Sequence, residues 1–224
     1  MNIYIFGHSI CRRRTPIYNF DTFTDILFEK YNLNPENLIR ADRISAERIL
    51  YFLKKIKDID LAIIFYGPID SVFVPSLDRD FTVNKIDDEM FLKYHEKRLK
   101  GSIALSDKQQ HSNKIEVMSA LRLNEKYFQS RDLTVNRNQG ALIQIDQYLT
   151  SKNIPAIHCP LGGTMPSWFK FTSGKLDLEI GNLQTYDNKH HWADLPNRVT
   201  NENNQYIANK LIEYIDQMVG RVGF

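Results

Sequence analysis

The stretch that most constrains the fold is "LAIIFYG", residues 61–67, a run without charge that ends in a glycine. A strand exposed on one face alternates apolar and polar side chains, whereas a strand covered on both faces is continuously apolar. We therefore expect residues 61–67 to form a central parallel strand between helical layers. Residues 2–6, which Gly7 ends, and residues 154–160 have the same character and predict two further buried strands.

Segments of helical periodicity separate these strands. Apolar residues recur there at spacings of three and four, and Asp21 and Ser45 are the expected N-caps of the first two helices. We expect helices at 19–31, 45–60, 140–153 and 200–219, and one more short strand at 37–42. Strands that alternate with helices are typical of an α/β fold, here a three-layer, doubly wound and mostly parallel sheet.

Residues 71–138 interrupt this alternation. They contain two helical patterns, at 87–99 and 114–129, joined by the polar stretch "SDKQQHSNK". A chain of 224 residues is long enough for one sizeable core. We therefore expect a single domain over 1–224 with a helical insertion at about 71–138.

The charge balance and the hydropathy exclude several classes of partner. With 29 basic and 27 acidic residues the net charge is only +2, so nothing in the composition points to nucleic acid or to an anionic membrane. The first residues lack the basic lead and long apolar core of a secretory leader, and no stretch is apolar enough to span a bilayer. We expect a cytoplasmic protein with Cys11 and Cys159 as free thiols.

Polar residues follow the expected strands at the position where open α/β sheets bind ligands, the carboxyl ends of the strands. They are His8 and Ser9 after the first strand, Asp42 and Arg43 after the second, and Gly67 and Asp70 after the third. A further polar segment, "YDNKHHWAD", lies before the last helix. These loops should meet at one edge of the sheet.

The same edge holds the residue types of an acyl-transfer triad. A serine becomes a good nucleophile when a histidine takes its proton and a carboxylate orients that histidine. Ser9 is the candidate nucleophile, His190 the base and Asp187 the orienting group, with His191 and Asp194 as an alternative pair. A turn serine and a polar surface loop are the structural alternatives to these roles.

The placement of these residues resembles the SGNH, or GDSL-like, hydrolases. Their blocks have counterparts in Gly7-His8-Ser9, in Gly67-Pro68-Ile69-Asp70 and in Asp187-Asn188-Lys189-His190, in the same order along the chain. The resemblance implies a flavodoxin-like sheet of the SGNH-hydrolase type and an esterase or acyltransferase that needs no cofactor or metal. The expected substrate is a small-molecule or carbohydrate ester, such as an O-acyl group of a sugar.

The chain also departs from that family. His8 stands where the family has aspartate, Asp42 falls near the glycine of the second block, and Ile69 replaces an asparagine that would donate to the oxyanion. An isoleucine side chain cannot donate a hydrogen bond. The residues expected to bind the oxyanion or the substrate are His8, Asp42, Arg43, Gly67 and Asp70.

Two other readings of the same edge remain open. A non-catalytic protein on this fold could use the "CRRR" loop, residues 11–14, to recognise an anionic or carbohydrate ligand. A zinc site could draw on histidine and cysteine ligands, although their spacing matches no specific zinc pattern. Those ligands are His8, Cys11, His158, Cys159, His190 and His191. Aromatic residues that could stack on a sugar ring are Tyr66, Trp168, Tyr186 and Trp192.

Overall fold

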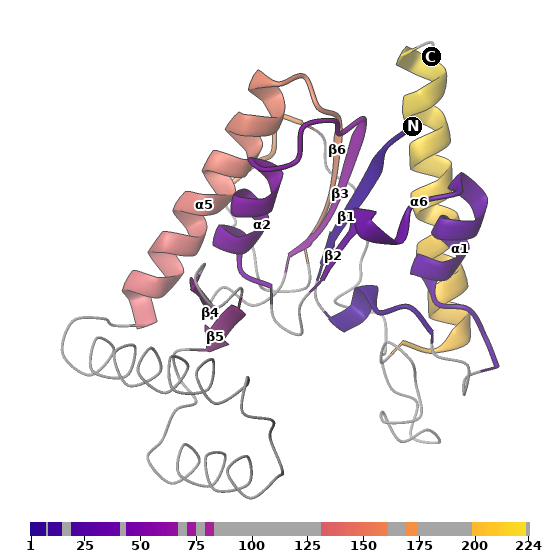
Figure 1. Ribbon diagram of the computed structural model, residues 1–224, viewed down its shortest axis with the longest axis horizontal. Helices are drawn as coiled ribbons and strands as arrows, with labels where there is room; N and C mark the ends of the chain where they lie inside the picture. Colours follow the sequence, from indigo (N-terminus) through magenta and orange to yellow (C-terminus); the bar gives the residue numbers. More distant parts are fainter. Residues whose placement is uncertain are drawn as a thin grey trace, which may run out of the picture.

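The computed structural model describes residues 1–7, 9–14, 19–40, 44–66, 71–74, 79–82, 131–160, 169–173 and 199–222. Within them lies a four-stranded parallel sheet in the order β2-β1-β3-β6 (Figure 1). The strands are β1 (Ile3–Gly7), β2 (Leu38–Arg40), β3 (Leu61–Tyr66) and β6 (Ala156–Pro160). The prediction of an α/β fold with a parallel sheet is confirmed.

Helices cover both faces of this sheet, two on each side (Figure 1). One pair is α1 (Phe23–Tyr31) with α6 (Asn201–Val222), and the other is α2 (Ala46–Leu53) with α5 (Arg131–Ser151). Neighbouring strand residues point to opposite faces. Ile5 therefore packs in the core beneath α1 and α6, and Phe6 in the core beneath α2 and α5. All of β3 is buried, which explains its continuously apolar sequence.

The helices that follow β1 and β2 both begin at side-chain caps. The Thr22 hydroxyl accepts the N–H of Asp25 at 3.3 Å, and the Asp25 carboxylate accepts the N–H of Thr22 at 3.1 Å, which completes a capping box. The prediction of Asp21 as the cap of α1 is therefore wrong by one residue, and Asp21 pairs with Arg14 instead. The prediction of Ser45 as the cap of α2 is confirmed.

Three elements differ from the sequence expectation. Helix α2 ends at Leu53 rather than at residue 60. The start of the expected insertion holds an antiparallel pair, β4 (Ser71–Val74) and β5 (Arg79–Thr82). Helix α5 begins at Arg131 rather than at 140, because contacts with α2 hold its polar first turns in place of an apolar stripe. One of these contacts is a hydrogen bond of 2.8 Å from Arg137 Nη2 to Glu47 Oε1. The helices expected at 87–99 and 114–129 lie outside the described residues.

The order of the strands creates a switch point between β1 and β3. Strand β2 pairs with one side of β1, and β3, the next strand along the chain, pairs with the other side of β1. In open α/β sheets, ligands bind outside the carboxyl ends of the strands at such a switch point. This edge lies toward the lower part of Figure 1, at the end of the sheet where β4 and β5 also lie.

Candidate functional site

Ser9 lies beside the switch point. It begins the 3-10 turn η1 (Ser9–Cys11), two positions after Gly7 ends β1. The other predicted site residues lie outside the described residues, and so do the alternative pair and three of the four candidate aromatic residues. They are His8, Asp42, Arg43, Gly67, Asp70, Asp187, His190, His191 and Asp194, with Trp168, Tyr186 and Trp192. Of the predicted site, the structure therefore describes the turn that begins with Ser9 and the residues that contact this turn.

Gly7 allows η1 to fold back closely against β1. A Cβ atom at position 7 would lie 2.1 Å from Cys11 Sγ and 3.3 Å from Phe65 Cβ, so a larger residue would collide with the turn. Cys11 and Cys159 are both fully buried, and burial raises the pKa of each thiol above its ordinary value. The Cys11 thiol is thus a packing group rather than a nucleophile or a metal ligand.

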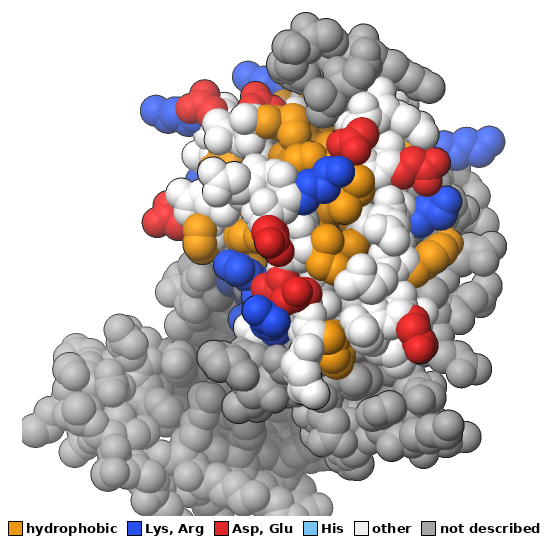
Figure 2. Space-filling model, turned by 90° about the vertical axis from the view of Figure 1, so that its right-hand side faces the viewer, with side chains coloured by type: hydrophobic (Ala, Val, Ile, Leu, Met, Phe, Trp, Pro, Cys, Tyr) orange, Lys and Arg blue, Asp and Glu red, His pale blue; other side chains and the backbone are white. Residues whose placement is uncertain are grey.

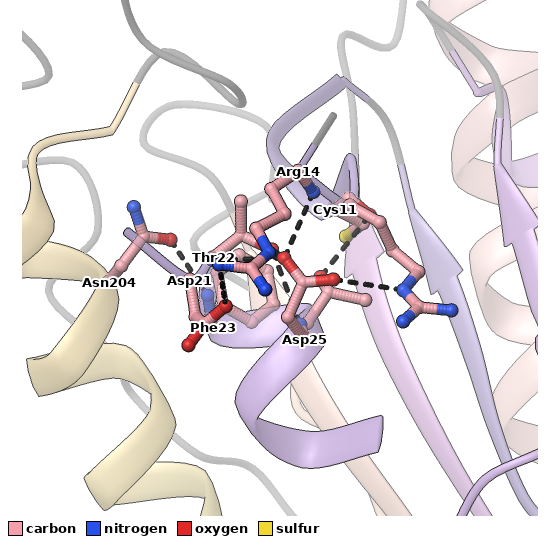
Figure 3. A network of polar contacts seen from close by, with 9 residues as sticks. Cys11, Arg14, Asp21, Thr22, Phe23, Asp25 and Asn204 are labelled. Atoms are coloured by element: carbon pink, nitrogen blue, oxygen red, sulfur yellow. Dashed lines mark hydrogen bonds and ion pairs between the residues drawn. The ribbon is translucent and has the colours of Figure 1, made fainter. Parts of the chain in front are cut away.

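The arginines after η1 are tied to the start of α1. Arg13 Nε donates to Asp25 Oδ1 at 2.9 Å, the backbone N–H of Arg14 donates to Asp25 Oδ2 at 2.9 Å, and the guanidinium of Arg14 lies 2.8 Å from Asp21 Oδ1 (Figure 3). All three arginines are exposed. Among the described residues, Arg13 and Arg14 have ion-pair partners and Arg12 has none. Two of the three arginines thus hold the loop in place, which weakens the reading of "CRRR" as an anion-binding loop.

A second polar network joins the sheet to α5, and it includes a serine and a histidine. Tyr66 Oη lies 2.7 Å from His158 Nδ1, His158 Nε2 lies 2.8 Å from Ser173 Oγ, and Ser173 Oγ lies 2.8 Å from Asp146 Oδ1. The ring of Phe171 stacks on the imidazole at 3.6 Å between centroids. His158 is fully buried, and Tyr66 is 2% exposed, so Tyr66 cannot serve as a platform for a sugar ring.

The number of available protons determines which group donates and which accepts in each hydrogen bond of this network. Burial alone would raise the pKa of Asp146, but hydrogen bonds from Thr172 and Ser173 lower it, so the carboxylate is ionised and only accepts. Ser173 must then give its single hydroxyl proton to Asp146 and accept the Nε2–H of His158. The neutral imidazole has no second N–H, and its Nδ1 accepts from Tyr66.

These donor and acceptor roles determine whether Ser173 and His158 could act as a nucleophile and its base. A catalytic serine gives its proton to the histidine, whereas Ser173 accepts a proton from His158 and donates to Asp146. The pair is therefore a structural relay and not a second nucleophilic dyad, despite the distance of 2.8 Å between Nε2 and Oγ. Sequence reasoning found His158 but missed Ser173 and Asp146, because no local motif links a helix residue to residues 26 and 27 positions later.

We predict that His158 keeps the neutral Nε2–H tautomer from pH 8 down to about 5. Burial lowers its pKa to about 3, with a smaller opposing effect of Asp146. In the unfolded chain the imidazole titrates near 6.5, so the contribution of His158 to stability is lost as the pH falls from about 6.5 toward 3. Nitrogen NMR shifts of the imidazole measure the tautomer. Protonation of His158 above pH 5 in the folded protein, or a proton on Nδ1, would contradict the relay; urea-unfolded protein is the control.

The zinc reading gains no support from the described residues. No group of three or more His, Cys, Asp or Glu side chains among them could hold a metal ion. Both ring nitrogens of His158 are already used by Tyr66 and Ser173.

The outer face formed by α1 and α6 carries charges of both signs. In Figure 2 acidic and basic side chains are interspersed with apolar ones over the described part of this face. Lys30 Nζ lies 3.4 Å from Asp216 Oδ2 across the two helices, and Tyr31 Oη donates to Asp216 Oδ1 at 2.9 Å. Such mixed charges give no extended field of one sign here. Among the described helices, none combines the length and the apolar character needed to cross a bilayer.

Comparison of the chain with protein-family models, with curated proteins and with solved structures finds no match.

Proposed function

We propose that the protein is a serine hydrolase or acyltransferase of the SGNH type, on a flavodoxin-like sheet, that acts on an ester such as the O-acyl group of a carbohydrate. The observation that carries the proposal is the position of Ser9, at the first residue of a turn that leaves β1 beside the switch point. A nucleophile at this position meets substrate in the crevice where open α/β sheets bind ligands. The ester and the sugar come from the resemblance and from the polar and aromatic residues of the rim.

In the proposed mechanism Ser9 attacks the ester carbonyl while His190 takes the hydroxyl proton. Asp187 orients His190, which then returns the proton to the leaving alcohol, and water or an acceptor hydroxyl releases the acyl group. Helix α6 begins at the same end of the sheet as η1 (Figure 1), so the chain reaches this edge within about ten positions after His190.

The oxyanion site of the proposed enzyme would be built largely from backbone. The N–H groups of Ser9 and Gly67 are the proposed donors, since Ile69 supplies no polar side chain. Removal of one oxyanion donor typically costs about 2.7–4 kcal/mol of barrier. We therefore expect a slower enzyme than one with a full set of donors, with Arg43, Asp42, Asp70 and His8 left to contact the substrate.

The test is the reaction of Ser9 with a fluorophosphonate probe and the turnover of a short-chain aryl ester. We expect Ser9→Ala to abolish labelling and turnover, because the bond to the probe forms at the Ser9 oxygen. Ser151→Ala is the matched control, since Ser151 is an exposed serine at the end of α5 and should leave both unchanged. Absence of labelling in the folded wild type, with turnover unaffected by Ser9→Ala, would overturn this proposal, and absence of both labelling and turnover would favour the non-catalytic binding protein.

A further inference from the structure

Asn204 is a fully buried amide in the first turn of α6 that bonds to two chain segments. Its Oδ1 accepts the backbone N–H of Phe23 at 2.8 Å. Its Nδ2 donates to the carbonyl oxygens of Val199 and Thr200, each at 3.1 Å. Figure 3 shows the side chain reaching from α6 toward the start of α1. The backbone that leads into α6 is thereby joined to α1.

The accepted N–H belongs to the first residue of α1, where no carbonyl of the helix itself is available. The Thr22 cap accepts the N–H of Asp25 and not that of Phe23, so Asn204 supplies the acceptor that Phe23 needs. A buried N–H without an acceptor costs free energy. The orientation of the Asn204 amide is therefore determined by α1 and not only by its own helix.

The same turn of α1 also holds the end of η1. Thr24, which is fully buried, donates its hydroxyl to the carbonyl oxygen of Cys11 at 3.2 Å. Asp25 accepts from Arg13 and from the backbone of Arg14, the next residues along the chain. The first turn of α1 is thus bonded on one side to the turn that begins with Ser9 and on the other side to the start of α6.

We propose that this turn of α1 is an anchor that sets the position of the turn carrying Ser9. Thr24 is the positioning residue that bonds η1, and Asn204 is the positioning residue that holds the anchor against α6. The inference rests on the proposed function. Ser9 lies two positions before Cys11, whose carbonyl accepts from Thr24, so a shift of the anchor is passed on to Ser9. A misplacement of a nucleophile by about 1 Å can cost about 100-fold in rate.

The opposite layer provides a matched control in Asn138 of α5. Its Oδ1 accepts the N–H of Ala46, the first residue of α2, at 3.1 Å, and its Nδ2 donates to the carbonyl of Thr134 at 3.1 Å. Asn138 is 1% exposed. The two asparagines thus make the same kind of bridge between a helix start and the neighbouring helix. The difference is that the first turn of α1 also bonds to η1 through Thr24 and to the residues after η1 through Asp25.

The experiment compares the rate of Ser9 labelling and the kcat and KM for an aryl ester in Asn204→Ala, Asn138→Ala, Thr24→Val and Thr24→Ser. All are measured below the onset of unfolding, at equal folded fraction by circular dichroism. We expect Asn204→Ala and Thr24→Val to slow labelling and to lower kcat by about tenfold or more with KM little changed. Asn138→Ala should stay within about twofold of wild type despite a similar loss of Tm, and Thr24→Ser, which keeps the hydroxyl, should restore the rate.

The outcomes separate the two proposals. If wild-type Ser9 is not labelled, the proposed function and the anchor both fail. If the wild type is labelled but Asn204→Ala is no slower than Asn138→Ala, the anchor alone is wrong. If Asn204→Ala does not fold, Thr24→Val against Thr24→Ser decides, and equal rates in these two variants overturn the anchor.

Discussion

Asp25→Asn is expected to lower the free energy of unfolding by about 3 kcal/mol at neutral pH. The Asp25 carboxylate accepts from Arg13 Nε, from Arg14 N and from both the N–H and the hydroxyl of Thr22, at distances of 2.7–3.1 Å. An amide at this position turns one acceptor oxygen into a donor that faces these donors. Its side chain is only 11% exposed, so water cannot replace the lost bonds. Urea denaturation of both proteins measures the difference.

The effect of Asp25→Asn should depend on pH in one direction. Burial alone would raise the pKa of Asp25, but the hydrogen bonds from Arg14, Thr22 and Arg13 lower it below its ordinary value. A carboxyl with a lowered folded pKa stabilises the fold above its unfolded pKa of about 4 and loses this contribution as the pH falls toward the folded pKa. The difference between wild type and Asp25→Asn should therefore narrow below pH 4.

Asp21→Asn is the control for this prediction. Asp21 lies four positions earlier and pairs with Arg14 at 2.8 Å, but its side chain is 40% exposed. An exposed ion pair contributes about 0–1 kcal/mol. A loss as large in Asp21→Asn as in Asp25→Asn, or a difference that does not narrow in acid, would show that Asp25 is not the centre of this network.

Gly7→Ala is expected to cost roughly 3 kcal/mol, because the added methyl group has no room between β1 and η1. The new Cβ would stand 2.1 Å from Cys11 Sγ, and the buried thiol has little space into which it can turn. Removal of the sulfur should relieve the collision. In Gly7→Ala/Cys11→Ala the nearest remaining atoms would be Cys11 Cβ at 3.1 Å and Phe65 Cβ at 3.3 Å, which is tight but tolerable with small shifts.

A double-mutant cycle measures this relief. We expect Cys11→Ala alone to cost about 1 kcal/mol, and the double variant to be more stable than Gly7→Ala alone, with a coupling energy of at least about 1 kcal/mol. Additive losses from the two substitutions would mean that Cys11 does not pack on Gly7. If Ser9 is the nucleophile, the same cycle should also restore part of its labelling, because η1 returns to its place.

The fold class was accessible from the sequence because it depends on periodicity. A strand buried on both faces, such as β3, needs apolar residues throughout, and helices that cover it need an apolar stripe. The Ser45 cap is equally local, since a hydroxyl accepts an N–H three residues later. The start of α5 was not predicted because its first turns have no apolar stripe. Instead, Arg137 and Asn138 of α5 bond to Glu47 and Ala46 of α2.

The sequence by itself thus determined the layers of the fold and the position of Ser9 at the end of the first strand. The tertiary structure decided the roles of the polar residues around it, since these depend on partners far away in the chain. Arg13 and Arg14 bond to α1 instead of a ligand, His158 becomes a neutral relay, and Asn204 joins Phe23 across 181 positions. Such hydrogen bonds form because packing of the layers brings donors and acceptors from distant parts of the chain together. No local sequence pattern encodes these contacts.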